Sequence, residues 1–147
     1  MLDPVIVATN GGCLLQPEAI EVIKYRLFPL ADLVTPNLHE ANILAGSSTT
    51  IQESATRILQ LGCKAVLVKG GHGDNCSAND LLLNAQGDCI WLKSNKINTQ
   101  NTHGTGCTLA AAIAALLAKG YDMKDACHVA KKYVFKTIDA AKHRCFG

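Results

Sequence analysis

The stretch that decides the fold runs from residue 32 to residue 71 and reads DLVTPNLHEANILAGSSTTIQESATRILQLGCKAVLVKGG. Short apolar runs at its two ends predict buried strands, and segments 37–46 and 50–62 between them predict helices. Each helix begins with a capping residue, Asn37 or Thr50, followed three positions later by a glutamate. Strands that alternate with helices favour an α/β protein whose sheet is mostly parallel.

The alternation continues on both sides of this stretch. Residues 3–9, DPVIVAT, predict another buried strand. Residues 16–31 predict a helix with Pro17 at its first position and with Ile20, Ile23 and Leu27 on one face. Residues 80–95 read as two strands around a turn, which indicates a β-hairpin. Two further helices are expected at 105–119 and 123–143.

Composition narrows the class of protein. The 147 residues are 48% hydrophobic and 18% charged with a net charge of +2, which suits one globular domain over residues 1–147. The absence of a basic tract argues against nucleic acid, and the longest apolar run, Leu109 to Ala118, is too short to cross a membrane. Seven cysteines, an odd number without CxxC spacing, argue against zinc and disulfides and favour a reducing cytoplasm.

Residues 101–107, NTHGTGC, lead directly into an apolar helix. The first N–H groups of a helix have no internal partner and carry partial positive charge. Gly104 and Gly106 allow the backbone to approach a ligand closely. The segment therefore predicts a site for a phosphate group, and the helix behind it, apolar nearly all round, is expected to be buried.

Cys107 stands where this loop meets the helix. A helix N-terminus favours the thiolate form of a cysteine, which could then accept a proton from a substrate hydroxyl. The alternative is that Cys107 is a small residue that packs well there. The residues alone leave both interpretations open.

The segment NTHGTGCTLAAAIAA (101–115) closely resembles the anion-hole motif of the ribokinase-like superfamily, specifically the hydroxymethylpyrimidine/phosphomethylpyrimidine kinase family. LDPVIVA, LVTPNLHEANILAG and AVLVKGGHG match that family in the same order, so the resemblance covers essentially the whole chain. It implies a three-layer α/β/α sandwich. It also implies use of ATP and Mg²⁺ to phosphorylate a small pyrimidine alcohol, 4-amino-5-hydroxymethyl-2-methylpyrimidine, and its monophosphate in thiamin biosynthesis.

The resemblance also implies residue roles. Cys107 would be the catalytic base, and the anion hole would be formed by Gly104, Thr105 and Gly106. The residues expected to bind ATP or its phosphates are Lys69, Asn37 and Thr102, and those expected to hold Mg²⁺ through water and phosphates are Glu40 and Asp3.

Plainer alternatives exist for several of these residues. Asn37 and Glu40 could simply cap a helix, Lys69 could be a solvated charge, and Asp3 could belong to a turn before Pro4. The loop histidines, at positions 39, 72 and 103, fit no metal-ligand spacing.

Relatives implied by the resemblance are nearly twice as long as this chain. The 147 residues therefore resemble a single partial domain, the C-terminal nucleotide-binding and catalytic half of such a kinase, truncated at both ends. We expect an isolated half to be inactive or prone to aggregate, since its first strand would have an unpaired edge. A homodimer is left open.

Three alternatives to the main reading stay open: a pyridoxal kinase, a hydroxyethylthiazole kinase, and an inactive nucleotide-binding remnant. Ala8 stands where one group of pyridoxal-phosphorylating relatives carries a reactive cysteine, which argues against pyridoxal as the main substrate.

Overall fold

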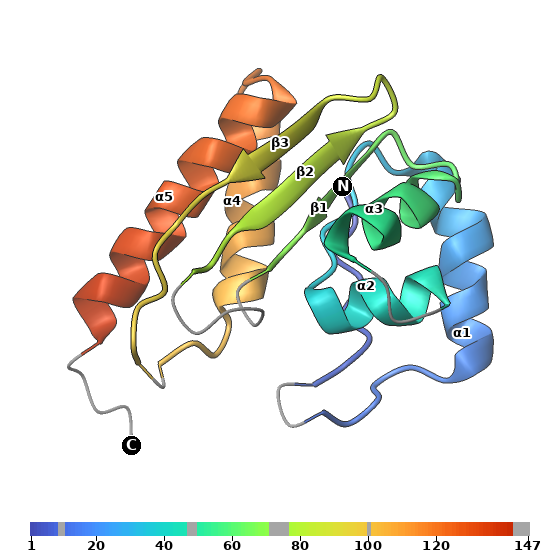
Figure 1. Cartoon of the computed structure of the whole chain (residues 1–147), viewed down its shortest axis with the longest axis horizontal. Coiled ribbons are helices and arrows are strands. Elements are labelled where there is room, and N and C mark those ends of the chain that lie inside the picture. The colour runs from blue at the N-terminus through green and yellow to red at the C-terminus, as the bar shows by residue number, and fades with distance from the viewer. Residues whose placement is uncertain (9–10, 47–49, 71–76, 100, 143–147) are drawn as a thin grey trace. The chain divides into compact units, whose positions relative to one another are not determined.

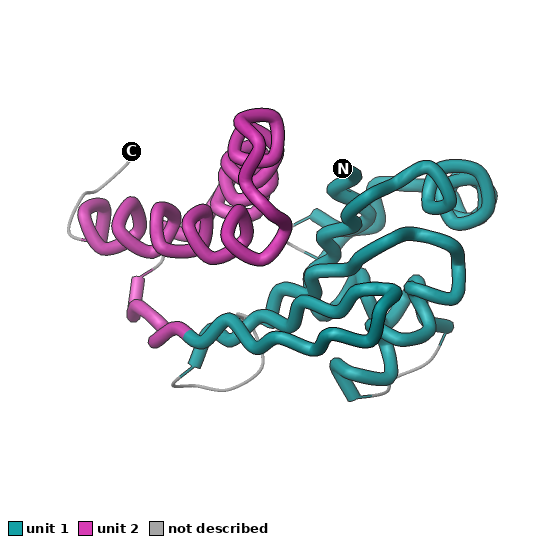
Figure 2. Tube along the Cα trace, turned by 90° about the horizontal axis from the view of Figure 1, so that it is seen from above, with its two compact units in different colours: residues 1–93 teal, residues 94–147 magenta. Residues whose placement is uncertain are grey.

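The computed structural model describes residues 1–8, 11–46, 50–70, 77–99 and 101–142. The chain divides into two compact units, Met1–Lys93 and Ser94–Gly147 (Figure 2). Within the described residues, no helix is both long and apolar enough to cross a membrane. The single partial domain over residues 1–147 stays a prediction.

In the first unit the helical segments come first and the three named strands follow them, and two long helices form most of the second unit (Figure 1). In chain order the elements are α1 (Pro17–Val22), η1 (Ile23–Leu27), η2 (Phe28–Leu30), α2 (Leu38–Ala45), α3 (Ile51–Leu59), β1 (Ala65–Val68), β2 (Asp80–Asn84), β3 (Cys89–Leu92), α4 (Thr105–Ala118) and α5 (Met123–Ala141). The chain is thus an α/β protein, as predicted, although its named strands follow the helices of the first unit and do not alternate with them.

The three named strands form a sheet in the order β1-β2-β3, and both neighbouring pairs are antiparallel. The predicted hairpin is confirmed: β2 and β3 are joined by a turn in which Gly87 has a φ of 93°. The prediction of a mostly parallel sheet is not confirmed for these strands. Parallel pairing is found, among the described residues, as isolated bridges that join Leu2 to Val34, Val34 to Val66 and Asn37 to Lys69.

The 33–38 segment nevertheless lies parallel along β1. Val34 donates its N–H to the carbonyl of Ala65 at 3.0 Å, and Lys69 donates to the carbonyl of Pro36 at 2.9 Å. Leu38 then donates to the carbonyl of Lys69 at 3.1 Å. Pro36 has no N–H to contribute, which interrupts the ladder and keeps this segment from forming a regular strand. The pairing places Asn37 beside Lys69.

The predicted strand at residues 3–9 is wrong. Pro4 lacks an N–H group, and Val5 donates its own to the carbonyl of Asp3 at 3.0 Å in a tight turn. The next donor, the N–H of Ile6, bonds to a side chain of α2, and Ala8 donates to Gly12 at 2.8 Å. The donors that a strand would use are therefore spent on local and side-chain contacts.

The predicted helix at 16–31 is confirmed as a continuous helical run, but its buried face is shifted. Ile23–Leu27 is a π-helical turn, which holds more residues than an α-turn. Ile20 and Ile23 pack against the core as expected, whereas Leu27 is 42% exposed and Phe28 is fully buried. The wider turn moves the inward position from Leu27 to the next residue.

The core of the first unit lies between one face of the sheet and helices α2 and α3. Both helices begin with the predicted capping boxes, and α2 ends at Gly46 in the left-handed conformation. The capped helices turn their small and branched residues toward the strands. The buried cluster includes Val66, Val68, Leu81, Ala41, Leu44, Ala55 and Ile58.

Gly70 is required by the fold because its backbone passes very close to Asn79. A Cβ atom at position 70 would stand 2.0 Å from the carbonyl oxygen of Asn79. We expect Gly70→Ala to lower the free energy of unfolding by about 2–3 kcal/mol, since backbone must move to relieve the overlap. Urea unfolding followed by the fluorescence of Trp91, the single tryptophan, measures the change.

Gly87→Ala provides the control, because a Cβ there meets nothing within 4 Å and only the strain of its positive φ is added. Equal unfolding curves for Gly70→Ala and the unchanged protein would contradict the close approach.

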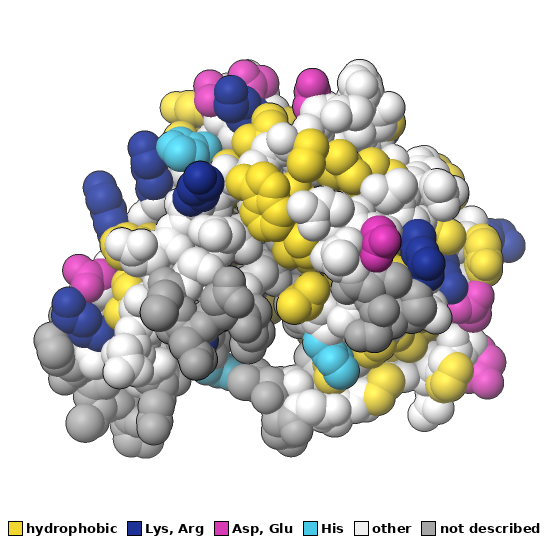
Figure 3. Space-filling model, in the orientation of Figure 1, with side chains coloured by type: hydrophobic (Ala, Val, Ile, Leu, Met, Phe, Trp, Pro, Cys, Tyr) yellow, Lys and Arg dark blue, Asp and Glu magenta, His cyan; other side chains and the backbone are white. Residues whose placement is uncertain are grey.

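The second unit is a hairpin of α4 and α5, which pack against each other. The prediction that α4 is buried all round is wrong, because only Leu109, Ala110 and Ile113 of its described residues are buried, while Ala111 and Ala114 are exposed. One partner helix in the unit covers one side of α4 and leaves other sides open. Lysine side chains, drawn in dark blue, are spaced along α5 at the left of Figure 3.

Candidate functional site

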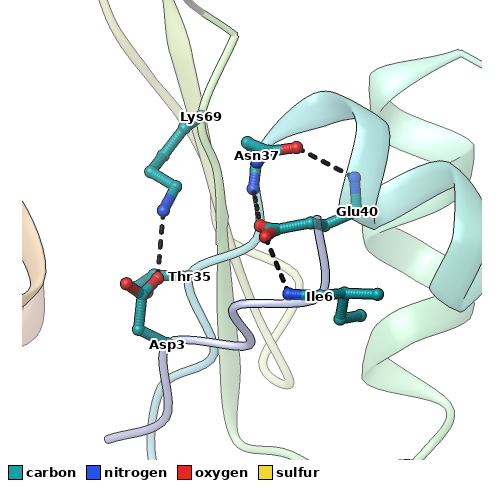
Figure 4. Close-up of polar contacts among 6 residues, drawn as sticks. All are labelled: Asp3, Ile6, Thr35, Asn37, Glu40 and Lys69. Atoms are coloured by element: carbon teal, nitrogen blue, oxygen red, sulfur yellow. Dashed lines mark hydrogen bonds and ion pairs between the residues drawn. The ribbon is translucent and has the colours of Figure 1, made fainter. Parts of the chain in front are cut away.

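A polar cluster lies at the end of β1 and consists of Asp3, Thr35 and Lys69, here called the Asp3 cluster (Figure 4). The ammonium group of Lys69 lies 3.0 Å from Oδ1 of Asp3, and the hydroxyl of Thr35 donates to the same oxygen at 2.7 Å. Only 16% of the Lys69 side chain and 17% of the Asp3 side chain is exposed. Lys69 is therefore a partly buried, paired charge rather than a solvated one.

Backbone pairing brings this cluster together. Leu2 donates its N–H to the carbonyl of Leu33 at 2.8 Å, and Thr35 donates to the carbonyl of Leu2 at 3.0 Å. These bonds place Asp3 next to the 33–38 segment, while Lys69 directly follows the last residue of β1. Three segments that are distant in sequence thus contribute one side chain each.

Glu40 lies in the first turn of α2 and is only 3% exposed. Its Oε2 accepts the N–H of Asn37 at 2.8 Å, while Oδ1 of Asn37 accepts the N–H of Glu40 at 2.9 Å. This is the predicted capping box. In addition, Oε1 of Glu40 accepts the N–H of Ile6 at 3.2 Å, which sequence reasoning did not anticipate. One carboxylate therefore ties the N-terminal segment to the start of α2 (Figure 4).

The position of Glu40 is electrostatically favourable. The N-terminus of α2 carries partial positive charge, and two backbone N–H groups point at the carboxylate. A buried carboxylate needs such donors, because it has lost its contact with water. Both oxygens are committed to the backbone, so Glu40 has a structural role whatever else it does.

In the second unit, local hydrogen bonds shape the segment that precedes α4. The carbonyl of Thr102 accepts both the N–H and the hydroxyl of Thr105, at 3.3 Å and 2.8 Å. Gly104 is the N-cap residue with a φ of 77°, and its carbonyl accepts the N–H and hydroxyl of Thr108, both at 2.9 Å. A side chain at position 104 would be strained in this left-handed conformation.

These bonds determine which amides are available to a ligand. The described part of the chain offers no acceptor for the N–H groups of Gly106 and Cys107, the second and third residues of α4. The amide of Thr105, by contrast, already bonds to Thr102. Of the three residues expected to form the anion hole, Gly104 supplies the turn and Gly106 an open amide. Cys107 adds a second open amide. Residues 101–107 are called the anion loop below.

The side chain of Cys107 is exposed. The interpretation of Cys107 as a packing residue is not supported, because its thiol is not enclosed by neighbours. Cys63 behaves differently: its side chain is buried, and burial raises the pKa of its thiol to about 11 from an ordinary value of 9.0.

This contrast predicts which cysteines react with an alkylating reagent. A pKa two units higher lowers the thiolate fraction of Cys63 about a hundredfold at pH 7, and burial slows access further. We expect Cys107 and Cys89, both exposed, to be alkylated at least that much faster than Cys63. Mass spectrometry of the labelled peptides measures the rates, and equal rates in the folded protein would contradict the burial.

The raised pKa has a defined sign for stability. The folded state holds the Cys63 proton more tightly than the unfolded chain does. The contribution of the Cys63 proton to the free energy of unfolding is therefore complete below about pH 9 and is lost as the pH rises toward 11.

Sequence reasoning missed two further polar residues. Asp80, 5% exposed, accepts the N–H of Gly70, the residue next to Lys69, at 3.0 Å. Asn101 donates its side-chain amide to the carbonyl of Ala141 at 2.8 Å. No pattern in the sequence identifies either contact, because each partner is a backbone group remote along the chain.

The histidines contribute no described metal site. His39 lies in α2 and His103 in the anion loop, while His72 is outside the described residues. Among the described residues, no group of three or more histidine, cysteine, aspartate or glutamate side chains could hold a metal ion.

Comparison with known proteins gives a consistent result. A family model described as Phosphomethylpyrimidine kinase matches residues 1–145. The chain is 46% identical, over 146 residues, to the hydroxymethylpyrimidine/phosphomethylpyrimidine kinase of Rhizobium meliloti, covering 96% of this chain and 54% of that protein.

Solved structures agree. A pyridoxal kinase from Staphylococcus aureus in complex with AMP-PCP matches 90% of this chain and 50% of its own with a TM-score of 0.81 at 35% identity. A phosphomethylpyrimidine kinase from Clostridium difficile matches 93% of this chain and 56% of its own with a TM-score of 0.74 at 36% identity. The chain thus spans about half the length of the proteins it matches.

Proposed function

This chain belongs to the phosphomethylpyrimidine kinase family, and from that premise we propose that it serves ATP-dependent phosphorylation of a pyrimidine alcohol. The substrates are 4-amino-5-hydroxymethyl-2-methylpyrimidine and its monophosphate, and the pathway is thiamin biosynthesis. The observation that carries the proposal is the family match over residues 1–145. The open amides at the start of α4 support it, because a helix N-terminus stabilises phosphate oxygens.

ATP is proposed as the phosphoryl donor because the similar pyridoxal kinase binds the ATP analogue AMP-PCP. The residues assigned to the nucleotide and its phosphates are Lys69, Asn37 and Thr102. Lys69 suits this role because it is held by Asp3 in a defined position, with its charge partly shielded from water. A phosphate group could bind the Lys69 ammonium group at little entropic cost, because the lysine side chain is already held in place by Asp3.

Mg²⁺ is proposed as the accompanying metal, with Asp3 and Glu40 as its carboxylates. Asp3 fits, since the described residues offer no partner for its second oxygen, Oδ2. Glu40 fits through water only, because both its oxygens accept backbone N–H groups. Mg²⁺ usually keeps several waters and binds one or two carboxylates plus phosphates. When bound, the ion neutralises charge on the phosphates.

The proposed reaction needs little covalent chemistry from the protein. The substrate hydroxyl attacks the γ-phosphorus of ATP, the bond to the β-phosphate oxygen breaks, and ADP leaves. The amides of Gly106 and Cys107 hold oxygens of the transferring phosphoryl group. The thiolate of Cys107 takes the hydroxyl proton. In the second phosphorylation the nucleophile is an ionised phosphate, which needs no strong base.

Pyridoxal is the second candidate substrate, because pyridoxal kinases are among the similar structures. The residue at position 8 is alanine, and this favours the pyrimidine. The test is ATP turnover by a chain completed to the length of its relatives, with the pyrimidine alcohol, its monophosphate, pyridoxal and the thiazole alcohol side by side. Turnover greatest with pyridoxal would replace the proposed substrate, and turnover with none would favour an inactive nucleotide-binding remnant.

The finer fold and the setting belong to the same proposal. We assign a ribokinase-like three-layer sandwich, supported by the TM-scores and by the parallel course of residues 33–38 along β1. A cytoplasmic location is supported by the described cysteines, at positions 13, 63, 89, 107 and 127, none of which forms a disulfide within the described part of the chain. A homodimer belongs to the same proposal, and analytical ultracentrifugation, which measures the mass of the particle in solution, tests it.

A further inference from the structure

Asn101, the first residue of the anion loop, is bonded to the far end of the second unit. Its side-chain amide donates to the carbonyl oxygen of Ala141, the last residue of α5, at 2.8 Å across forty residues of sequence. The final carbonyls of a helix have no acceptor role inside it, so this donor fills a vacant position. The backbone N–H of Asn101 in turn donates to the hydroxyl of Thr99 at 3.2 Å.

The bonds that Thr102 and Gly104 make within the described part of the anion loop are local. Thr102 bonds to Thr105 and Gly104 bonds to Thr108, which defines the curvature of the turn. Such bonds move with the loop and do not determine how the turn is oriented against the helical hairpin. The far end of the loop continues into α4, while Asn101 ties its near end to α5. The loop is thus held by both helices of its unit.

We propose that Asn101 is a positioning residue whose bond to the C-terminal turn of α5 orients the anion loop, so that the amides of Gly106 and Cys107 face an anion together. The inference rests on the proposed function in taking the anion loop as the phosphoryl-binding element. It adds that the last turn of α5, where Lys142 pairs with Asp139 at 2.7 Å, controls the loop at a distance along the chain.

The chemistry of the contact selects the variants. A carbonyl accepts and cannot donate, so only a side chain with an N–H or O–H group can replace the asparagine. Asn101→Leu keeps the approximate shape and removes the donor. Asn101→Gln keeps the amide donor on a side chain that is longer by one methylene group, so it should restore part of the hydrogen bonding to the Ala141 carbonyl. Asn98→Leu, three residues earlier at an exposed position of the same segment, is the matched control.

Hydrogen exchange in the 147-residue chain gives a readout that needs no enzyme activity. The amide of Thr108 bonds to the carbonyl of Gly104, so it reports opening of the loop. Asn101→Leu should speed exchange at Thr108 about fivefold, the effect of losing one hydrogen bond. Asn98→Leu should leave it unchanged, and the amide of Ala126 at the start of α5 should not respond. Unaltered exchange at Thr108 in Asn101→Leu would overturn the proposal.

A second measurement separates positioning from simple support of the fold. Inorganic phosphate is titrated while the amide signals of Gly106 and Cys107 are followed by NMR. We expect Asn101→Leu to weaken phosphate binding severalfold, with partial recovery in Asn101→Gln. Faster exchange at Thr108 with unchanged phosphate affinity would show a structural contact only and overturn the proposal. Lack of phosphate binding by the unchanged chain would count against the proposed function. The exchange rate at Thr108 would still test whether Asn101 orients the anion loop.

The helix end supplies a coupling test. Ala141→Gly loosens the last turn of α5, because glycine is a poor helix former. If the Asn101 bond transmits that change, Ala141→Gly should speed exchange at Thr108 in the unchanged chain but not in Asn101→Leu. Equal, additive effects in both backgrounds would mean that α5 does not act through Asn101.

Discussion

Replacing Cys107 with alanine should slow phosphorylation of the primary alcohol by about 10²–10⁴, the usual effect of losing a general base. The affinity for nucleotide should hardly change, because the open amides belong to the backbone and remain. Phosphorylation of the monophosphate should lose less, since that nucleophile is already ionised. Steady-state kinetics with each substrate, in a chain completed to the length of its relatives, measures the two effects separately.

The exposed thiol on β3 supplies the control for this experiment. Cys89→Ala removes an exposed thiol from the other unit and should leave both rates intact. Cys107→Asp should keep activity, because a carboxylate can accept the proton from the same place. Full alcohol turnover by Cys107→Ala would leave the amides alone as the working part of the loop.

Glu40→Gln should destabilise the first unit by about 2–4 kcal/mol, although it changes one atom and one charge. The carboxylate is buried and accepts backbone N–H groups from Ile6 and Asn37. Glutamine offers one acceptor and turns a donor toward the other N–H, which leaves a buried donor unpaired. Urea unfolding followed by Trp91 fluorescence measures the loss. Interpreted as a magnesium ligand alone, Glu40 would have been expected to tolerate this change.

Glu53→Gln is the matched control, because Glu53 occupies the same position in the capping box of α3. It is exposed and accepts a backbone N–H from Thr50 at 3.1 Å, without a contact like that of Ile6. We expect its effect to stay below about 0.5 kcal/mol, as for most surface substitutions. Equal losses in the two variants would show that the Ile6 bond adds nothing. Any loss of activity in Glu40→Gln has to be judged against its stability.

The features that the sequence predicted well are local. Asn37 and Thr50 cap their helices because a short oxygen-bearing side chain meets amides two or three residues on, and the glutamates that complete each box are equally close. The turn at Gly87 and the start of α4 at Gly104 are local too, because each depends on the positive φ of a single glycine. Such features need no knowledge of the rest of the chain.

The features that the sequence did not predict depend on remote partners. The apolar run at 3–9 reads as a strand, yet Pro4 and the buried Glu40 divert its donors. The Asp3 cluster was anticipated as a set of residues, but its ion pair and its low exposure follow from pairing among three distant segments. Asn101 gave no signal at all, because its acceptor is a backbone carbonyl forty residues away.

The π-turn at Ile23–Leu27 has a consequence for how such sequences diverge. A turn that closes one residue later than an α-turn is equivalent to an α-helix with a single insertion. Deletion of one residue from this turn would restore regular α-helical winding. Phe28, the residue before Pro29, would then lie on a different side of the helix. Homologous chains can therefore differ in length by one inside this helix while the flanking backbone, from Pro17 to the buried Phe28, keeps its course. An alignment gap at this point would mark a change of helical pitch rather than a loop.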